Sequence, residues 1–253
     1  MALFDNKTAL VTGGGAGIGR AAALAFAREG ASVVIGNRSV DRGEETVDLI
    51  RKSGGTAVFR RTDVTVAADV EALVGFAVSE FGRLDFAFNN AGIFADLTPI
   101  TDLAEDVYDA VIDTNVKGVW LSMKYELKHM LKLGRGVIVN NASIGGLVGS
   151  GGGLAAYVAS KHAVVGLTKC AALENAKKGV RVNVVCPAVI DTDMAEKFAK
   201  DLGITTEQFG EVHPIGRNGR PEEVASAVVY LCSDGASFMT GSSVVIDGGL
   251  TAQ

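Results

Sequence analysis

The stretch TALVTGGGAGIG, Thr8–Gly19, joins a short apolar run to a cluster of glycines, and an alanine-rich segment from Arg20 to Arg28 follows it. A strand, a glycine turn and a helix in this order direct backbone N–H groups and a helix N-terminus towards a phosphate. The glycines do not have the GxGxxG spacing, and a glycine turn without a ligand is the alternative interpretation. The position between a strand and a helix favours a nucleotide site.

Short apolar runs alternate with helical segments along the rest of the chain. Six further strands are expected at residues 32–36, 56–60, 84–88, 136–140, 180–186 and 244–247. Helices are expected at residues 41–52, 67–81, 105–133, 154–179 and 221–232, with short helices at 194–201 and 206–210. This alternation predicts a Rossmann-type, doubly wound α/β fold, in which a parallel sheet of about seven strands has helices on both faces. No linker marks a boundary, so we expect residues 1–253 to form one domain.

The composition argues against several classes of protein. Hydrophobic residues make up 48% of the 253 residues and charged residues 21%, which is typical of a globular chain with a large core. A net charge of −5 without a Lys/Arg cluster argues against nucleic-acid binding. The pattern of a signal peptide and an apolar run long enough for a membrane span are both missing. Cys170, Cys186 and Cys232 are scattered, so we expect free thiols, no metal site and a cytoplasmic protein.

Tyr157 and Lys161 are four residues apart in the apolar segment from Leu154 to Ala172. On a helix this spacing places the two side chains one above the other on the same face. A nearby ammonium favours the phenolate, and a base that works near neutrality needs the tyrosine pKa to fall by roughly 3 units, or about 4 kcal/mol. An isolated pair of this kind is more often a surface tyrosine above a surface lysine, so other motifs have to decide.

Five motifs in register resemble the classical short-chain dehydrogenase/reductase family. They are TGxxxGIG at residues 12–19, NNAG at residues 89–92, Asn115, Ser143, and YxxxK at residues 157–161. The resemblance extends from about residue 5 to residue 250 and implies an NAD(P)(H)-dependent oxidoreductase. Such an enzyme transfers a hydride between the nicotinamide and a small ketone or secondary alcohol.

The resemblance implies four catalytic residues. Tyr157 would exchange a proton with the substrate oxygen, and Lys161 would lower the Tyr157 pKa and bond the nicotinamide ribose. Ser143 would donate a hydrogen bond to the substrate oxygen, where charge develops. Asn115 would anchor a water molecule that links Lys161 to solvent. The alternative for Asn115 is a polar residue in mid-helix that bonds the backbone.

The resemblance also implies the coenzyme site. The turn residues would face the phosphates, two residues would contact the adenine, the NNAG motif would line the ribose side, and a later segment would flank the nicotinamide. In chain order these are Gly13, Gly17, Ile18 and Gly19; Asp63 and Val64; Asn90, Ala91 and Gly92; and Pro187, Ile190 and Thr192, to which Tyr157 and Lys161 are added.

The residues after the second expected strand bear on the choice of coenzyme. NAD-preferring relatives have an acidic residue there, which accepts hydrogen bonds from the adenine-ribose 2′-hydroxyl and would repel a 2′-phosphate. This chain has Asn37 followed by Arg38. An amide beside a guanidinium removes the repulsion and offers a partner for phosphate, so we predict NADP(H), with NAD(H) as the second possibility. Arg38 could instead stack on the adenine, which would serve either coenzyme.

Two segments are expected to determine the substrate: the glycine-rich loop at residues 145–153 and a lid at about residues 193–213. The lid offers apolar side chains such as Met194 and Phe198, which favours an apolar or weakly polar carbonyl compound. Ala188 stands where the family usually has glycine, which adds a methyl group beside the nicotinamide and the substrate. A first alternative function is a 3-oxoacyl-thioester (carrier-protein) reductase, although Leu173 stands where such reductases tend to have arginine. A second is a non-catalytic NADP(H)-binding sensor, which the intact catalytic set argues against.

The resemblance further implies a homotetramer, because classical members of the family commonly pair through the long helix and the tyrosine-containing helix, and through the last helix and last strand. Some relatives bind a structural Mg²⁺ through the terminal carboxylate, which would belong to Gln253 here. The sequence shows no ligand set for such an ion, and we assign no metal.

Overall fold

The computed structural model describes residues 2–253 and contains one seven-stranded sheet in the order β3-β2-β1-β4-β5-β6-β7. Every neighbouring pair of strands is parallel. The strands are β1 (Thr8–Thr12), β2 (Ser32–Asn37), β3 (Thr56–Arg61), β4 (Phe86–Asn89), β5 (Gly136–Asn141), β6 (Val180–Pro187) and β7 (Ser243–Ile246). The chain reverses its direction across the sheet between β1 and β4. Ligands of doubly wound sheets bind at such a point, at the carboxyl ends of the strands.

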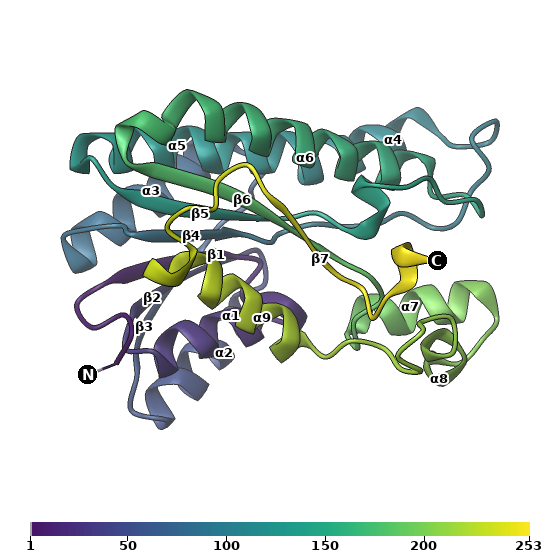
Figure 1. Cartoon of the computed structure of the whole chain (residues 1–253), viewed down its shortest axis with the longest axis horizontal. Coiled ribbons are helices and arrows are strands. Elements are labelled where there is room, and N and C mark those ends of the chain that lie inside the picture. The colour runs from purple at the N-terminus through teal and green to yellow at the C-terminus, as the bar shows by residue number, and fades with distance from the viewer. Residues whose placement is uncertain (1) are drawn as a thin grey trace.

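Within residues 2–253, nine α-helices connect or follow these strands. They are α1 (Gly17–Arg28), α2 (Val40–Lys52), α3 (Ala67–Phe81), α4 (Glu105–Ile112), α5 (Gly118–Leu133), α6 (Ala155–Asn175), α7 (Asp193–Leu202), α8 (Thr206–Gly210) and α9 (Pro221–Cys232). Figure 1 shows α1, α2 and α9 below the sheet, α3 to α6 above it, and α7 with α8 beyond one end. In the described part of the chain, no helix is both long and apolar enough to cross a membrane. The predicted α/β fold with helices on both faces is confirmed.

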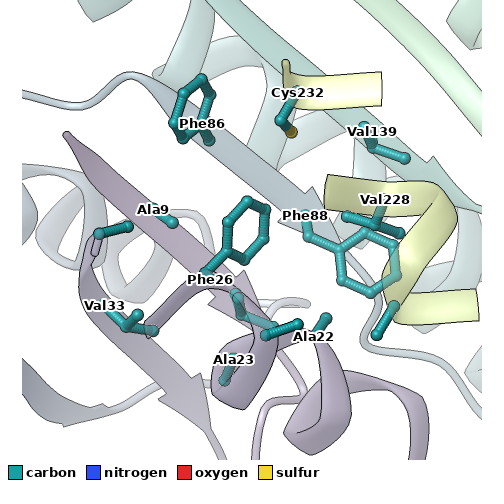
Figure 2. Packing of buried hydrophobic residues seen from close by; sticks show 14 of the residues in the cluster. Ala9, Ala22, Ala23, Phe26, Val33, Phe86, Phe88, Val139, Val228 and Cys232 are labelled. Atoms are coloured by element: carbon teal, nitrogen blue, oxygen red, sulfur yellow. The ribbon is translucent and has the colours of Figure 1, made fainter. Parts of the chain in front are cut away.

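Side chains of successive strand residues point to opposite faces of the sheet and enter separate cores. Ala9 and Val11 of β1 pack with α1, α2 and α9, whereas Leu10 packs with α3, α5 and α6. Phe26 of α1 is fully buried, and its ring is stacked on Phe86 with the centroids 6.0 Å apart (Figure 2). Full burial of such a side chain stabilises the fold by about 1.5–3 kcal/mol. This packing fixes α1 on the sheet with its first residue at the carboxyl edge.

The long helix predicted at residues 105–133 is not a regular α-helix throughout. Between α4 and α5 lies a π-helical turn, Asp113–Lys117. A π turn inserts an extra residue into the helix and is often found at functional sites. Here it turns Thr114 towards the cleft described below and buries the neighbouring Asn115. The expected uninterrupted helix was therefore wrong in this segment, which the apolar pattern does not distinguish from an α-helix.

Candidate active site

A cavity of about 890 Å³ follows the carboxyl ends of the strands from β3 to β6 in the order of the sheet. It is lined by residues of the glycine turn, of the ends of β2, β3, β4, β5 and β6, and of α6 and α7. The structure brings nearly all the predicted site residues to this one cavity. Its lining includes Gly13, Gly17, Ile18, Asn37, Arg38, Asp63, Val64, Asn90, Ala91, Gly92, Ser143, Tyr157, Lys161, Pro187, Ile190 and Thr192. Gly19 and Asn115 are the two predicted residues that lie behind the lining.

The glycine turn brings the backbone to the floor of the cavity. Gly13 and Gly17 have φ angles of +66° and +50°, which side-chain-bearing residues rarely adopt. Helix α1 begins at Gly17, so its free N–H groups face the cavity. Gly19 lies behind the lining, where a Cβ would overlap the Gly13 carbonyl and the Asn90 amide, and its contact with the coenzyme stays a prediction. Its missing side chain allows the turn and β4 to pack closely.

Hydrogen bonds join β1 to the NNAG motif. Thr12 Oγ1 accepts from the backbone N–H groups of Asn90 and Ala91 at 3.1 and 3.2 Å. Asn90 Nδ2 donates to the carbonyls of Thr12 and Gly13, both at 3.2 Å, and Asn90 Oδ1 accepts from Asn141 Nδ2 at 2.9 Å. The side chain of Asn90 thus ties three strands together, and it shapes the site through the backbone it holds.

The end of β2 forms one end of the cavity. Asn37 Nδ2 donates to the Ser39 carbonyl at 2.9 Å. Arg38 lines the cavity beside it, and Arg42 of α2 forms an ion pair of 2.9 Å with Asp193 at the start of α7. Partial burial opposes ionisation of Asp63, but hydrogen bonds from Thr65 and the charge of Arg38 outweigh it and keep the Asp63 pKa below its ordinary value. At the end of β2, where NAD-preferring relatives have a carboxylate, this chain therefore has the neutral amide of Asn37, with the guanidinium groups of Arg38 and Arg42 and the carboxylates of Asp63 and Asp193 nearby.

The predicted catalytic side chains meet at the other end. Ser143 follows β5, and its hydroxyl accepts from the Gly145 backbone at 3.1 Å. A Cβ placed on Gly145 would lie 3.6 Å from the Ser143 hydroxyl oxygen and 3.8 Å from the Tyr157 ring, so both side chains border the same point. Lys161 lies one turn after Tyr157 on α6, and its Nζ is 5.4 Å from the centre of the tyrosine ring. Serine, tyrosine and lysine therefore form one cluster, in which the spacing predicted the tyrosine–lysine pair and the family resemblance implied the serine.

Burial determines the charge of this pair. Lys161 is 5% exposed, and desolvation lowers its pKa to about 8, while Nζ donates to the Asn141 carbonyl at 3.0 Å. Burial also raises the pKa of Tyr157 above its ordinary value, and the Ser143 hydroxyl opposes this rise. Burial of the phenol is thus the largest influence on Tyr157, and the lowering of its pKa by Lys161 stays a prediction. Burial also makes loss of the lysine proton easier.

Asn115 supports the cluster from behind the cavity lining. Its Oδ1 accepts from the Ile93 backbone N–H and its Nδ2 donates to the Ile93 carbonyl, both at 2.8 Å. Nδ2 also donates to Ser160 Oγ at 3.0 Å. A Cβ on Gly92 would lie 3.2 Å from Asn115 Oδ1 and 3.6 Å from Lys161 Nζ, so the two side chains border the same glycine. These bonds run to the loop after β4 and to α6, so the role predicted for Asn115 beside Lys161 stays a prediction.

The substrate end of the cavity is largely apolar. Phe94, Phe198 and Phe209 form a continuous group, with ring centroids 5.6 Å apart for the first pair and 5.0 Å for the second. Ile144, Val148, Leu154 and Met194 also line the cavity. Ala188 lies in the lining too. Its φ is not positive, since Asn6 alone among the non-glycine residues of 2–253 has a positive φ, so the backbone at position 188 accepts alanine.

Sequence reasoning missed several residues of this site. Phe94 and Arg42 line the cavity, but neither belongs to a recognisable motif. Asn141 acts through its backbone carbonyl, which leaves no sequence signal. Ser160 bonds Asn115 and lies inside the YxxxK motif, at a position that the motif leaves open. A polar residue at an otherwise apolar helical position was the available signal for Ser160.

The residues fit a nicotinamide dinucleotide. The glycine turn and the α1 N-terminus suit a pyrophosphate, and Val64 and Ile190 are apolar surfaces for the two rings. Thr192 lies beside the turn, with its methyl carbon Cγ2 3.0 Å from a Cβ placed on Gly17, and its hydroxyl donates to the Ile190 carbonyl at 3.1 Å. Among residues 2–253, no group of three or more His, Cys, Asp or Glu side chains is placed to hold a metal ion.

Comparisons with known proteins agree with this geometry. The family described as Enoyl-(Acyl carrier protein) reductase matches residues 13–251. The chain is 45% identical over 250 residues to cyclohexanol dehydrogenase of Acinetobacter sp. (strain SE19), covering 99% of this chain and 97% of that protein. It is 41% identical to 2,5-dichloro-2,5-cyclohexadiene-1,4-diol dehydrogenase of Sphingobium indicum (strain DSM 16412 / CCM 7286 / MTCC 6364 / B90A), over the full length of both.

A solved structure shows the same fold. The crystal structure of levodione reductase superposes with a TM-score of 0.95 at 37% identity, covering 98% of this chain and 99% of that one. Full-length matches at this level, together with the serine–tyrosine–lysine cluster at the carboxyl edge of the sheet, identify the chain as an oxidoreductase of the classical short-chain dehydrogenase/reductase family.

Proposed function

We propose that this enzyme transfers a hydride between NADP(H) and a small alicyclic ketone or secondary alcohol, with Tyr157 as the acid/base. The convergence of Ser143, Tyr157 and Lys161 at one end of the cavity carries the proposal. When bound, the coenzyme accepts or supplies the hydride. In alcohol oxidation Tyr157 Oη takes the hydroxyl proton as the C–H hydride leaves, and in ketone reduction it returns a proton to the carbonyl oxygen.

Ser143 and Lys161 support this proton transfer in different ways. The Ser143 hydroxyl donates to the substrate oxygen and stabilises the negative charge that develops there. Lys161 has a pKa lowered to about 8 by burial, so it is close to the operating pH at which a proton relay is most efficient. Asn115 holds the Ile93 backbone beside Lys161 and thereby keeps Gly92 in place. We propose that a water molecule anchored near Asn115 links Lys161 to solvent.

The preference for NADP(H) is supported by charge at the end of β2. Asn37 has no carboxylate to repel a 2′-phosphate, and Arg38 lines the same part of the cavity. Arg42 is held by an exposed ion pair with Asp193, and such pairs contribute about 0–1 kcal/mol. Its guanidinium is therefore easily released to a phosphate.

An alicyclic substrate is supported by the cavity and by the relatives. The substrate end offers the rings of Phe94, Phe198 and Phe209 and aliphatic side chains, which suit a compact apolar ring. The lid of residues 193–213, which includes α7 and α8, would close over it. Both relatives named above are dehydrogenases of ring alcohols by name. The family description favours one second candidate, an acyl-thioester reductase.

A panel of carbonyl compounds tests the proposal. NADPH and NADH oxidation would be measured with cyclohexanone and substituted cyclohexanones, linear ketones of equal carbon number, and an acyl-carrier-protein thioester. We expect the highest kcat/KM for a cyclic ketone with NADPH. Preference for the thioester would favour the second candidate. Coenzyme binding without turnover on any compound would favour a non-catalytic sensor instead.

We also propose a cytoplasmic homotetramer. Large apolar side chains are exposed on the outer helices, among them Tyr108 of α4, Trp120 of α5 and Leu173 of α6, the last 83% exposed. Phe238 and Tyr230 form a second exposed group near α9. Light scattering after size exclusion would give the mass of four chains if both faces pair.

A further inference from the structure

Glu126 of α5 is a buried carboxyl that the proposed reaction does not use. The residue is 0% exposed, and its Oε2 accepts a hydrogen bond from Asn89 Nδ2 at 3.0 Å. None of the ion pairs in the described chain involves it. Burying an ionised carboxylate without a cation costs several kcal/mol, and such a group takes up a proton instead.

Two oxygen atoms of this pair have no partner among residues 2–253: Glu126 Oε1 and Asn89 Oδ1. They belong to the same two side chains that the Nδ2–Oε2 bond already joins. A protonated carboxyl facing a primary amide forms a ring of two hydrogen bonds, because the acid O–H donates to the amide oxygen while the amide N–H donates to the other acid oxygen. One proton on Glu126 therefore satisfies both atoms. A charged carboxylate would leave both acceptors unpaired.

We propose that Glu126 is a neutral acid which, through a hydrogen-bonded ring with Asn89, positions the ends of β4 and β5 beneath the active site. Asn89 Nδ2 also donates to Asn140 Oδ1 at 3.0 Å, and these two residues are register partners in β4 and β5. Asn140 Nδ2 donates in turn to Thr168 Oγ1 of α6 at 2.9 Å. The buried polar cluster (Glu126, Asn89, Asn140 and Thr168) thus joins α5, β4, β5 and α6.

Each asparagine of the buried polar cluster precedes a residue of the site. Asn90 follows Asn89 and bonds the glycine turn, and Asn141 follows Asn140 and accepts the hydrogen bond of Lys161 Nζ. Glu126 contacts neither, so it is a positioning residue. A shift of about 1 Å at a reacting group lowers rates by about 100-fold, which makes the register of these strand ends important for catalysis.

The surroundings of Glu126 contain few groups that titrate. Strands β4 and β5 bring Asn89 and Asn140 towards it, and α6 brings Thr168, none of which ionises in this range. On its own helix, the next ionisable side chain on the same face is His129, one turn later. Burial raises the pKa of Glu126 to about 8, and the Asn89 hydrogen bond opposes this. Near neutrality the acid is mostly protonated.

Infrared difference spectroscopy with Glu126→Gln tests the charge directly. Gln has a donor and an acceptor in the places of the acid O–H and C=O, so the ring is kept. We expect the wild-type minus Glu126→Gln spectrum at pH 6 to contain the C=O band of a neutral carboxylic acid, which fades as the pH rises through about 8. A spectrum with only a carboxylate band at pH 6 would overturn the proposal.

Kinetics tests the positioning role, and this arm rests on the proposed function. We expect Glu126→Gln to keep kcat/KM within about twofold of wild type at pH 7, and Glu126→Leu to lose about tenfold to 100-fold, mainly in kcat. Met130→Leu, one turn later on α5, also fully buried and without a hydrogen bond to the buried polar cluster, is the matched control and should match wild type. A Gln variant as impaired as the Leu variant would contradict the proposal. Wild-type protein inactive on the whole panel would overturn the proposed function alone, since the infrared result stands without turnover.

Discussion

Replacing Lys161 by methionine should abolish activity and stabilise the protein. Lys161, next to Tyr157, is only 5% exposed. Its ammonium group loses water contacts on folding, so the charged form opposes folding near neutral pH. Methionine has a similar length, no charge and enough flexibility to fill the same space. The variant therefore removes a desolvation penalty together with the proposed proton relay.

The expected increase in the free energy of unfolding follows from the pKa of Lys161. Each pKa unit corresponds to about 1.4 kcal/mol, and the Lys161 pKa falls from 10.5 to about 8. The charged lysine therefore opposes folding by about 3 kcal/mol. The Asn141 carbonyl loses its donor in the variant, which costs about 1 kcal/mol. A net gain of about 2 kcal/mol remains, or roughly 4–8 °C in Tm for a chain of this size.

The pH dependence gives this prediction its sign. A lysine with a lowered native pKa destabilises the protein most below about 8, and the penalty disappears as the pH rises from about 8 to 10.5. Urea unfolding without coenzyme would be measured for both proteins at pH 7 and pH 10. We expect the variant to be more stable at pH 7 and the difference to shrink at pH 10. A variant less stable than wild type at pH 7 would refute the reasoning.

Asn37→Asp should move the ratio of kcat/KM for NADPH and NADH at least tenfold towards NADH, because the new carboxylate repels a 2′-phosphate; an unchanged ratio would contradict the proposed coenzyme site. Gly19→Ala should lower the free energy of unfolding by about 1–3 kcal/mol, since its Cβ overlaps the Gly13 carbonyl. Gly75 is a helical glycine with open space where a Cβ would lie, so Gly75→Ala is the matched control and should raise the free energy of unfolding by about 0.5–1 kcal/mol. Urea unfolding measures both variants. Asn115→Ala leaves the backbone N–H and carbonyl of Ile93 unpaired and should lower kcat by about tenfold or more. Asn115→Ser should be equally impaired, because a serine side chain is too short to make both bonds.

Much of the fold could be predicted because apolar strands, glycine turns and helical segments follow one another in a regular order. The helices at 67–81 and 221–232 have the predicted bounds, since Gly82 and Pro221 mark one end of each. The π turn at Asp113–Lys117 could not be predicted, because one inserted residue hardly changes the apolar pattern of a long helix. Asn115 in this turn donates a hydrogen bond to Ser160 of α6, which is 45 residues away in the sequence.

The candidate site was predictable where a side chain acts within a motif. Tyr157 and Lys161 lie together as their spacing indicated, and Ser143 joins them as the family resemblance implied. The pKa directions could not be read from sequence, because they depend on how deeply Tyr157 and Lys161 are buried. Glu126 was visible as an acidic residue among apolar helical positions, but its partner Asn89 is 37 residues away. Such a pair becomes apparent only once the strands are in register.

The proton transfer by Tyr157 is tested most directly by removing one oxygen atom. Initial rates of cyclohexanone reduction with NADPH would be measured for wild type and Tyr157→Phe, with the Kd for NADPH from fluorescence titration as the control. We predict that kcat/KM falls by about 10²–10⁴-fold while the Kd changes by less than about threefold. A Tyr157→Phe enzyme that binds NADPH and keeps wild-type kcat/KM would contradict the assignment of Tyr157 as the acid/base.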